Sequence, residues 1–195
     1  MIAGLLLAAG GARRFGSQKL VATVDGVPLV RRAHDSLAEV VDSVFVVVGA
    51  EAPAVSQALE STKATIIVNP DWADGLSTSI RRGIAAVPID AEAVIVALGD
   101  EPEVDARIAV ELIATWKNTG RPIVAARYQG VQSHPVLFDR SVFAELSTIE
   151  GDVGAKSVIY RSAERVAFVD VASARPIDVD VPEDLRRLRK PIGEE

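Results

Sequence analysis

Short apolar runs recur along the chain, separated by longer segments in which apolar residues follow a helical spacing. The first run, residues 2–8, carries no polar side chain and ends shortly before two consecutive glycines. A run this short without polar side chains is typical of a strand buried on both faces. The same pattern predicts strands at residues 43–48, 65–68, 93–98 and 123–126, with further candidates at 135–138 and 166–171.

Segments with helical spacing lie between these runs. Leu29, Ala33 and Leu37, for example, fall on one face of a helix that begins at Pro28. Helices are predicted at 28–40, at 52–60, from one of residues 77–79 to 86, and from 104 or 105 to 117, with later candidates at 141–146, 154–161 and 182–189. Strands that alternate with helices predict an α/β protein with a three-layer, doubly wound, mostly parallel sheet and helices on both faces.

The order of the first four strands decides where a ligand would bind. If they lie in the order third, second, first, fourth, a switch point falls between strands 2–8 and 93–98. Ligands of doubly wound sheets bind at such a point, outside the carboxyl ends of the strands. The glycine-rich loop after residue 8 and the turn at residues 99–102 would then flank one crevice. We expect the ligand site there.

Composition and charge narrow the class of protein. The 195 residues are 49% hydrophobic and 25% charged, which predicts one globular domain over 1–190 and a frayed tail over 191–195. The net charge of -6 argues against a general nucleic-acid surface. The absence of cysteine excludes disulfides, zinc–thiolate sites and thiol nucleophiles. Without a signal-peptide pattern or an apolar run near the roughly 20 residues of a membrane span, the chain is expected to be cytoplasmic.

The loop after the first strand has the composition of a phosphate site. Gly10 and Gly11 leave backbone N–H groups open to an anion, and Arg14 and Lys19 add positive charge. A Walker A loop is excluded because Leu20, and not Ser or Thr, follows the lysine. The spacing of the glycines also fails the dinucleotide-binding fingerprint G-x-G-x-x-G. The loop therefore predicts phosphate binding without matching either common motif.

Three aspartates are candidates for a metal site. Asp100 closely follows the strand at 93–98, and Asp178 and Asp180 share one side of an extended segment because strand side chains alternate. A hard divalent cation prefers carboxylate and phosphate oxygens and usually takes one or two carboxylates. We expect Asp100 and Asp180 to be the ligands, with Asp178 as the next candidate for the second ligand. The alternatives are that Asp100 is a helix cap or a turn aspartate and that Asp180 caps the helix beginning at Pro182.

Three of these segments carry a family resemblance. Residues 7–19 resemble the signature L-A-A-G-x-S-x-R-M-G-x-x-K of nucleotidyltransferases with the MobA-like NTP transferase fold, with Ala12 in place of Ser and Phe15 in place of Met. LGDEP at 98–102 and DVDVPEDL at 178–185 are similar to the family's L-G-D-Q-P and D-V-D-T-P-E-D-L. The resemblance assigns the loop to the nucleotide and the aspartates to the metal.

Further segments match in the same order along the chain. GLSTS at 75–79, SHPVLF at 133–138 and GDVGAK at 151–156 resemble G-M-x-x-S, G-H-P-V-L-F and G-D-x-G-A-R. The resemblance implies that Gly75 and Ser79 line the base pocket and that His134 and Lys156 face the acceptor. Glu101 stands where the family has Gln, and it is expected to add negative charge near the metal.

The resemblance implies a Mg²⁺-dependent nucleotidyltransferase, most similar to molybdenum cofactor cytidylyltransferases. An acceptor phosphate would attack the α-phosphorus of an NTP and release pyrophosphate, with Asp100 and Asp180 holding Mg²⁺ and with Arg14 and Lys19 stabilising the leaving phosphates. The nucleotide-binding residues would be Ala8, Ala9, Gly10, Gly11, Arg14, Lys19, Gly75 and Ser79. The L-A-A-G form at residues 7–10 favours CTP over GTP.

The implied acceptor is molybdopterin carrying its molybdenum, and a transient contact with a molybdenum hydroxylase or its maturation factor is a further expectation. Neither a nucleic acid nor a membrane is expected as a partner. Three alternatives stay open: another acceptor such as a sugar phosphate or phospholactate, a non-catalytic pterin or nucleotide carrier, and an oxidoreductase related to nicotine blue oxidoreductases. Asp100 and the basic pair argue against the carrier, and the missing dinucleotide fingerprint weakens a standard NAD site.

Overall fold

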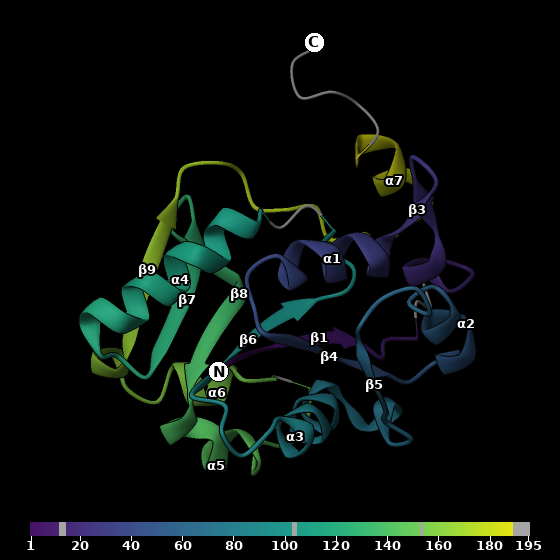
Figure 1. Ribbon diagram of the computed structural model, residues 1–195. Coiled ribbons are helices and arrows are strands. Elements are labelled where there is room, and N and C mark those ends of the chain that lie inside the picture. The colour runs from purple at the N-terminus through teal and green to yellow at the C-terminus, as the bar shows by residue number, and fades with distance from the viewer. Residues whose placement is uncertain (12–14, 103–104, 153, 189–195) are drawn as a thin grey trace.

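A seven-stranded sheet forms the centre of the molecule (Figure 1). The computed structural model describes residues 1–11, 15–102, 105–152 and 154–188. The strand order is β5-β4-β1-β6-β8-β7-β9. The strands are β1 (Ile2–Ala8), β4 (Ser43–Val48), β5 (Thr65–Val68), β6 (Ala93–Leu98), β7 (Ile123–Tyr128), β8 (Val131–Asp139) and β9 (Val166–Val171), and a separate hairpin joins β2 (Thr23–Val24) to β3 (Val27–Pro28).

The helices lie on both faces of the sheet, as the alternating pattern predicts (Figure 1). They are α1 (Leu29–Ala38), α2 (Ala52–Gln57), α3 (Leu76–Ala86), α4 (Ala106–Thr119), α5 (Phe143–Leu146), α6 (Lys156–Ile159) and α7 (Pro182–Leu188). Single turns of 3₁₀ helix occur at η1 (Lys19–Val21), η2 (Trp72–Asp74), η3 (Arg140–Val142) and η4 (Ala163–Arg165). Helices α1 and α4 cover one face, and α3, α5 and α6 cover the other.

The sheet is mostly parallel and has the expected order for its first four long strands. β1 pairs in parallel with β4 on one side and with β6 on the other, and β5 pairs in parallel with β4. β8 is the exception, because it runs antiparallel to both β6 and β7. The carboxyl ends of β1 and β6 therefore lie side by side, and the predicted switch point between these two strands is confirmed.

Alternation along β1 divides the hydrophobic core in two. Leu6 packs in a cluster with residues of α1 and α4, whereas Leu5 and Leu7 pack in a cluster with residues of α3 and α5. Both clusters are built from side chains that are almost completely buried. Because side chains of a strand alternate between its faces, a central strand covered on both sides needs apolar residues at every position. This requirement explains the unbroken apolar run that marks β1 in the sequence.

Several expected elements have different limits in the structure. β8 begins at Val131, so His134 lies inside a strand and not in a loop, because pairing with β7 extends the strand beyond its apolar part. The helix expected at 154–161 is only the four residues of α6. The third helix begins at Leu76 and not at one of residues 77–79. The tail expected at 191–195 lies outside the described residues.

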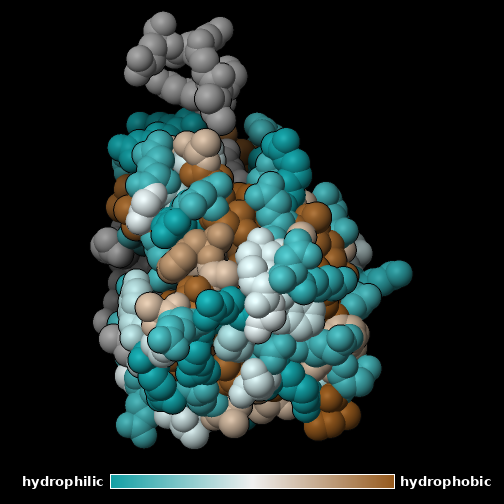
Figure 2. Space-filling view, turned by 90° about the vertical axis from the view of Figure 1, so that its left-hand side faces the viewer, coloured by the Kyte–Doolittle hydropathy of each residue, from teal (hydrophilic) through white to brown (hydrophobic). Residues whose placement is uncertain are grey.

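The β9 edge of the sheet is protected by charge. Arg127 of β7 forms an ion pair with Asp170 of β9, with a nitrogen–oxygen distance of 2.6 Å, and its guanidinium lies 4.5 Å from the ring centre of Phe168. Figure 2 looks onto this side of the molecule, where hydrophilic and hydrophobic side chains are interleaved. Charged side chains on an edge strand discourage pairing with another chain. Among the helices of the described residues, none is long and apolar enough to cross a membrane.

Candidate active site

A cleft of about 860 Å³ opens at the carboxyl ends of β1 and β6, where the switch point is expected to bind a ligand. Residues from five separate segments line it. They include Ala9, Gly10, Gly11, Lys19, Gly75, Ser79, Asp100 and Asp180, all named from the sequence as nucleotide or metal residues. Ala8 is buried at the end of β1. Arg14 lies outside the described residues. The structure thus brings together segments that are more than 160 residues apart in the chain.

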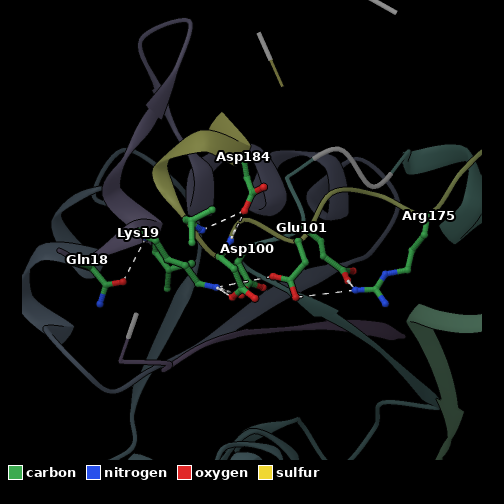
Figure 3. A network of polar contacts seen from close by, with 10 residues as sticks. Gln18, Lys19, Asp100, Glu101, Arg175 and Asp184 are labelled. Carbon is green, nitrogen blue, oxygen red and sulfur yellow. Dashed lines mark hydrogen bonds and ion pairs between the residues drawn. The ribbon is translucent and has the colours of Figure 1, made fainter. Parts of the chain in front are cut away.

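Lys19 is the centre of the polar network in the cleft (Figure 3). Its Nζ lies 2.6 Å from Oδ2 of Asp100, 3.2 Å from Oδ1 of Asp180 and 3.8 Å from Oδ1 of Asp178. Burial by itself lowers the pKa of Lys19, but the carboxylates, Asp100 foremost, more than offset it, and the pKa is raised. The lysine is therefore a fixed positive charge at any pH near neutrality.

Gln18 and the start of η1 fix the position of this lysine. The side-chain Oε1 of Gln18 accepts a hydrogen bond from the amide of Leu20 at 3.3 Å, and its Nε2 donates to the carbonyl of Ala50 at 2.9 Å. Gln18 is itself buried. A buried amide with both ends bonded holds the turn firmly, because each lost bond would leave an unsatisfied polar group. The loop after β1 is thereby tied to the loop after β4.

Asp100 does not cap the helix that follows it. Asp105 caps α4, accepting a hydrogen bond from the amide of Arg107 at 2.8 Å, and Asp100 lies in the turn after β6. Asp184, in the first turn of α7, accepts hydrogen bonds from the amides of Asp180 and Val181, each at 3.0 Å, and so fixes the segment that leads into the helix. The carboxylate of Asp180 contacts Lys19.

The donor atoms around Lys19 fit a hard divalent cation. The carboxylate oxygens of Asp100 and Asp180 converge on the same point, which the ammonium group of Lys19 occupies. Mg²⁺ usually takes one or two protein carboxylates and completes its shell with water and substrate phosphate. Within the described residues, no group of three or more His, Asp or Glu side chains forms a metal-binding cluster on its own. A cation bound here would therefore complete its shell with oxygen ligands from water or from the substrate.

Glu101 departs from its expected role. Its side chain is only 1% exposed, and its Oε2 has no hydrogen-bond partner among the described residues. Burial, and next the charge of Asp100, raise the pKa of Glu101 from 4.5 to about 8. The carboxyl is therefore mostly protonated at neutral pH and resembles the amide of Gln in shape and charge. The raised pKa opposes the expected negative charge of Glu101 near the metal.

We predict that Glu101→Gln makes the protein relatively more stable at high pH. The folded-state pKa of Glu101 is raised above its unfolded value, so its contribution to stability is complete below pH 4.5 and is lost as the pH rises to about 8. Glutamine does not titrate at this position. The unfolding free energy of the variant minus that of the unchanged protein should therefore be larger at pH 9 than at pH 5. Urea unfolding at both pH values measures this difference.

The matched control is Glu60→Gln, since Glu60 is exposed on the surface. Its difference from the unchanged protein should be the same at both pH values. Asp178, whose pKa burial and Asp100 raise to about 6, interacts with Glu101 by charge, so the measured difference includes that interaction. A difference for Glu101→Gln that does not change with pH would contradict the assignment of a protonated Glu101.

Two loops that are far apart in the sequence contact each other at the expected base pocket. Gly75 has φ of +111°, and an added Cβ would lie 2.7 Å from the carbonyl oxygen of Gly151, so only glycine fits. The amide of Leu76, the first residue of α3, donates to Oδ1 of Asp152 at 3.2 Å, and the amide of Ser77 donates to the carbonyl of Gly151 at 3.2 Å. Asp152 and the carbonyl of Gly151 therefore satisfy the first two amides of α3.

Asn69 orients the hydroxyl of Ser79 and was not identified from the sequence. Its Nδ2 donates to Oγ of Ser79 at 3.0 Å and to Oγ1 of Thr78 at 2.8 Å, and its Oδ1 accepts from the amide of Asp71 at 3.1 Å. The side chain is completely buried. An Asn-Pro-Asp sequence signals a loop, and nothing in that signal shows that the amide turns inward toward the next helix.

The expected acceptor residues do not line the cleft. His134 and Lys156 are absent from the described residues that form its walls. Burial lowers the pKa of His134 to about 4, while the charge of Asp100 opposes this and the charges of Arg175 and Lys156 add to it. His134 is therefore neutral at physiological pH. Arg175, whose guanidinium lies 3.8 Å from Oε1 of Glu101, is a further basic residue here that sequence reasoning missed.

Comparisons with known proteins place these features in a family. Residues 4–166 match the MobA-like NTP transferase domain. Nicotine blue oxidoreductase of Paenarthrobacter nicotinovorans is 31% identical over 198 residues, with 96% of each chain covered. The crystal structure of Rv0371c from Mycobacterium tuberculosis H37Rv has 28% identity and a TM-score of 0.86, covering 96% of this chain and 97% of that one. A second structure of Rv0371c, in complex with manganese, has the same identity and coverage and a TM-score of 0.82.

Proposed function

The chain belongs to the MobA-like NTP transferase family, and we propose that it transfers CMP from CTP to a phosphorylated acceptor and releases pyrophosphate. The observation that carries the proposal is the cleft itself. It joins the open backbone of Gly10 and Gly11 and the charge of Lys19 to the carboxylates of Asp100 and Asp180. A triphosphate needs these groups in one place: donors for its oxygens and ligands for its cation.

The residues of the cleft divide into three roles. The backbone of Gly10 and Gly11 and the ammonium group of Lys19 bind the β- and γ-phosphates and stabilise the charge that grows on leaving pyrophosphate. Arg14 adds to this charge. Gly75 and Ser79 position the base. The acceptor phosphate attacks the α-phosphorus in line, so that one P–O bond forms as the bond to pyrophosphate breaks, and no covalent enzyme intermediate is required.

We propose Mg²⁺ as the cation, held by Asp100 and Asp180. When bound, it neutralises phosphate charge in the transition state. The manganese complex of Rv0371c supports a divalent cation in this group of proteins, and Mn²⁺ is therefore a natural substitute in assays. The two aspartates supply oxygen ligands close to where the triphosphate would lie, which is the chemistry that both cations prefer.

The proposed acceptor is molybdopterin, with His134 and Lys156 on its side of the site. Lys156 keeps the charge of the family's Arg but not its two-pronged fork, which suits a single phosphate oxygen. A transient contact with a molybdenum hydroxylase or its maturation factor follows from this acceptor. The test incubates the protein with CTP, Mg²⁺ and, in turn, molybdopterin, a sugar phosphate and phospholactate, and follows pyrophosphate release. If pyrophosphate is released only with one of the other acceptors, molybdopterin is not the acceptor, but the proposed nucleotidyl transfer still holds.

We predict that CTP is preferred over GTP. Ala9 lines the cleft and is almost completely buried, and its methyl group takes space that a purine would need. A steric mismatch of this kind is worth roughly ten- to two-hundred-fold in specificity. Ala9→Gly should reduce the preference. Competition between CTP and GTP for one acceptor, before and after the substitution, measures it, and a preference of the unchanged protein for GTP would contradict the choice of CTP.

A second candidate function rests on the 31% identity to nicotine blue oxidoreductase. The chain would then reduce a dye-like substrate with an electron donor. The aspartates around Lys19 argue for phosphate and metal chemistry instead, because a hydride transfer needs neither. Incubation with nicotine blue and NADH, NADPH or a reduced flavin, followed by the change in absorbance, separates the two functions. Dye reduction without NTP-dependent pyrophosphate release would favour the oxidoreductase.

A further inference from the structure

Trp72 lies between the loop expected to bind phosphate and the loop expected to bind the base. A Cβ added to Gly11 would lie 2.8 Å from Cζ3 of Trp72, and one added to Gly49 would lie 2.6 Å from its Cβ. The indole thus packs against the backbone of two glycines, one after β1 and one after β4. It also lines the cleft and is only partly buried. Part of this large aromatic side chain therefore faces the space where a nucleotide would bind.

The segment that carries Trp72 is held rigidly. Asp71 immediately precedes it, its amide donates to Asn69, and its carbonyl accepts hydrogen bonds from the amide of Asp74 and from Oγ1 of Thr78 at 3.1 and 3.0 Å. These bonds fasten the turn to the first turn of α3. Because its turn is already fixed, Trp72 would lose little conformational freedom when a ligand binds. This low entropic cost suits a surface that contacts a ligand.

We propose that Trp72 is a contact surface for the nucleoside of the NTP, on which the base or its ribose packs. The inference rests on the proposed function and adds a residue to it. Phosphate gains nothing from an indole, whereas a nucleobase stacks on one, whatever its identity. Because stacking tolerates every base, Trp72 should contribute to affinity for CTP and GTP alike and leave the choice between them to Ala9 and Ser79.

The chain has two tryptophans, so the second one can serve as a control. Trp116 lies on α4, and its indole nitrogen donates a hydrogen bond to Asp139. The full-length protein, Trp72→Phe, Trp72→Leu and Trp116→Phe are titrated with CTP, GTP and pyrophosphate. CTP should change the emission of the unchanged protein and of Trp116→Phe, but not of Trp72→Phe. Affinities measured by calorimetry should fall roughly tenfold or more for CTP and GTP in Trp72→Leu, and little in Trp72→Phe.

Pyrophosphate is the decisive probe because it has no base. Its affinity should be the same for Trp72→Leu and the unchanged protein. Equal losses for pyrophosphate and CTP would overturn the inference, since Trp72 would then act only by supporting the Gly11 loop. Unchanged CTP affinity in Trp72→Leu would also overturn it and leave the proposed function standing. If the unchanged protein binds no NTP, the proposed function fails first and the inference with it.

Discussion

Asp100→Asn is expected to lower turnover by a factor on the order of 100 or more, with the fold intact. The side chain follows the end of β6, 2.6 Å from Nζ of Lys19, and it is the residue that the metal and the lysine would share. Asparagine has nearly the same shape but no charge, so it binds a divalent cation weakly. The loss is expected in the rate at saturating CTP and Mg²⁺, since the charge acts most strongly in the transition state.

The matched control is Asp90→Asn, which makes the same chemical change on an exposed residue before the amino end of β6. Its turnover should equal that of the unchanged protein. Pyrophosphate release at saturating CTP gives the rates, and thermal unfolding shows that both variants are folded. Near-normal turnover of Asp100→Asn would remove the metal assignment for this residue.

The central strands could be predicted because burial on both faces leaves a local signature. β1, β4 and β6 occupy the limits expected from their apolar runs, since a strand covered on both sides has no place for a polar side chain. Their order follows from crossover rules that apply to any alternating strand and helix pattern. The position of the cleft between β1 and β6 could therefore be predicted from the sequence.

The full extent of β8 could not be predicted from its local pattern of polarity. It runs antiparallel between β6 and β7, and its first residues, Val131 to His134, are mixed in polarity. Residues 131–133 are extended because β7 pairs with them, and a local polarity pattern does not show which strands will pair. The register between β7 and β8 also shifts between Ala125 and Ala126.

The candidate site divides in a similar way. Lys19, Asp100 and Asp180 could be named because each lies in a motif with a chemical purpose. The supporting contacts could not, since they depend on which side chains meet in space. Asp184 bonds the amides of Asp180 and Val181, and the pKa of Glu101 is raised because the side chain is buried beside Asp100. Residue identity therefore suggests the reacting groups, and packing decides their charge and direction.

Lys19→Met is expected to lower kcat/KM for CTP by a factor on the order of 100 to 1,000, the usual effect of removing one donor to transition-state charge. Methionine keeps the length of the side chain and fills the space, so packing of η1 is preserved. Lys117→Met is the control, because Lys117 is exposed in the last turn of α4, and its kcat/KM should not change. Normal activity of Lys19→Met would mean that the lysine serves only to neutralise the aspartates.

The same variant tests whether the ammonium group and a divalent cation compete for the same oxygens. Nζ of Lys19 lies within 3.2 Å of both Asp100 and Asp180, so a cation bound by both carboxylates must displace it or share them. Without NTP, Mg²⁺ or Mn²⁺ should therefore raise the Tm of Lys19→Met more than that of the unchanged protein, since stabilisation grows with affinity for the folded state. In Lys19→Met with Asp100→Asn the gain should vanish. An equal rise in Tm for all three proteins would show that the cation binds elsewhere, and that the lysine and the metal do not share one site.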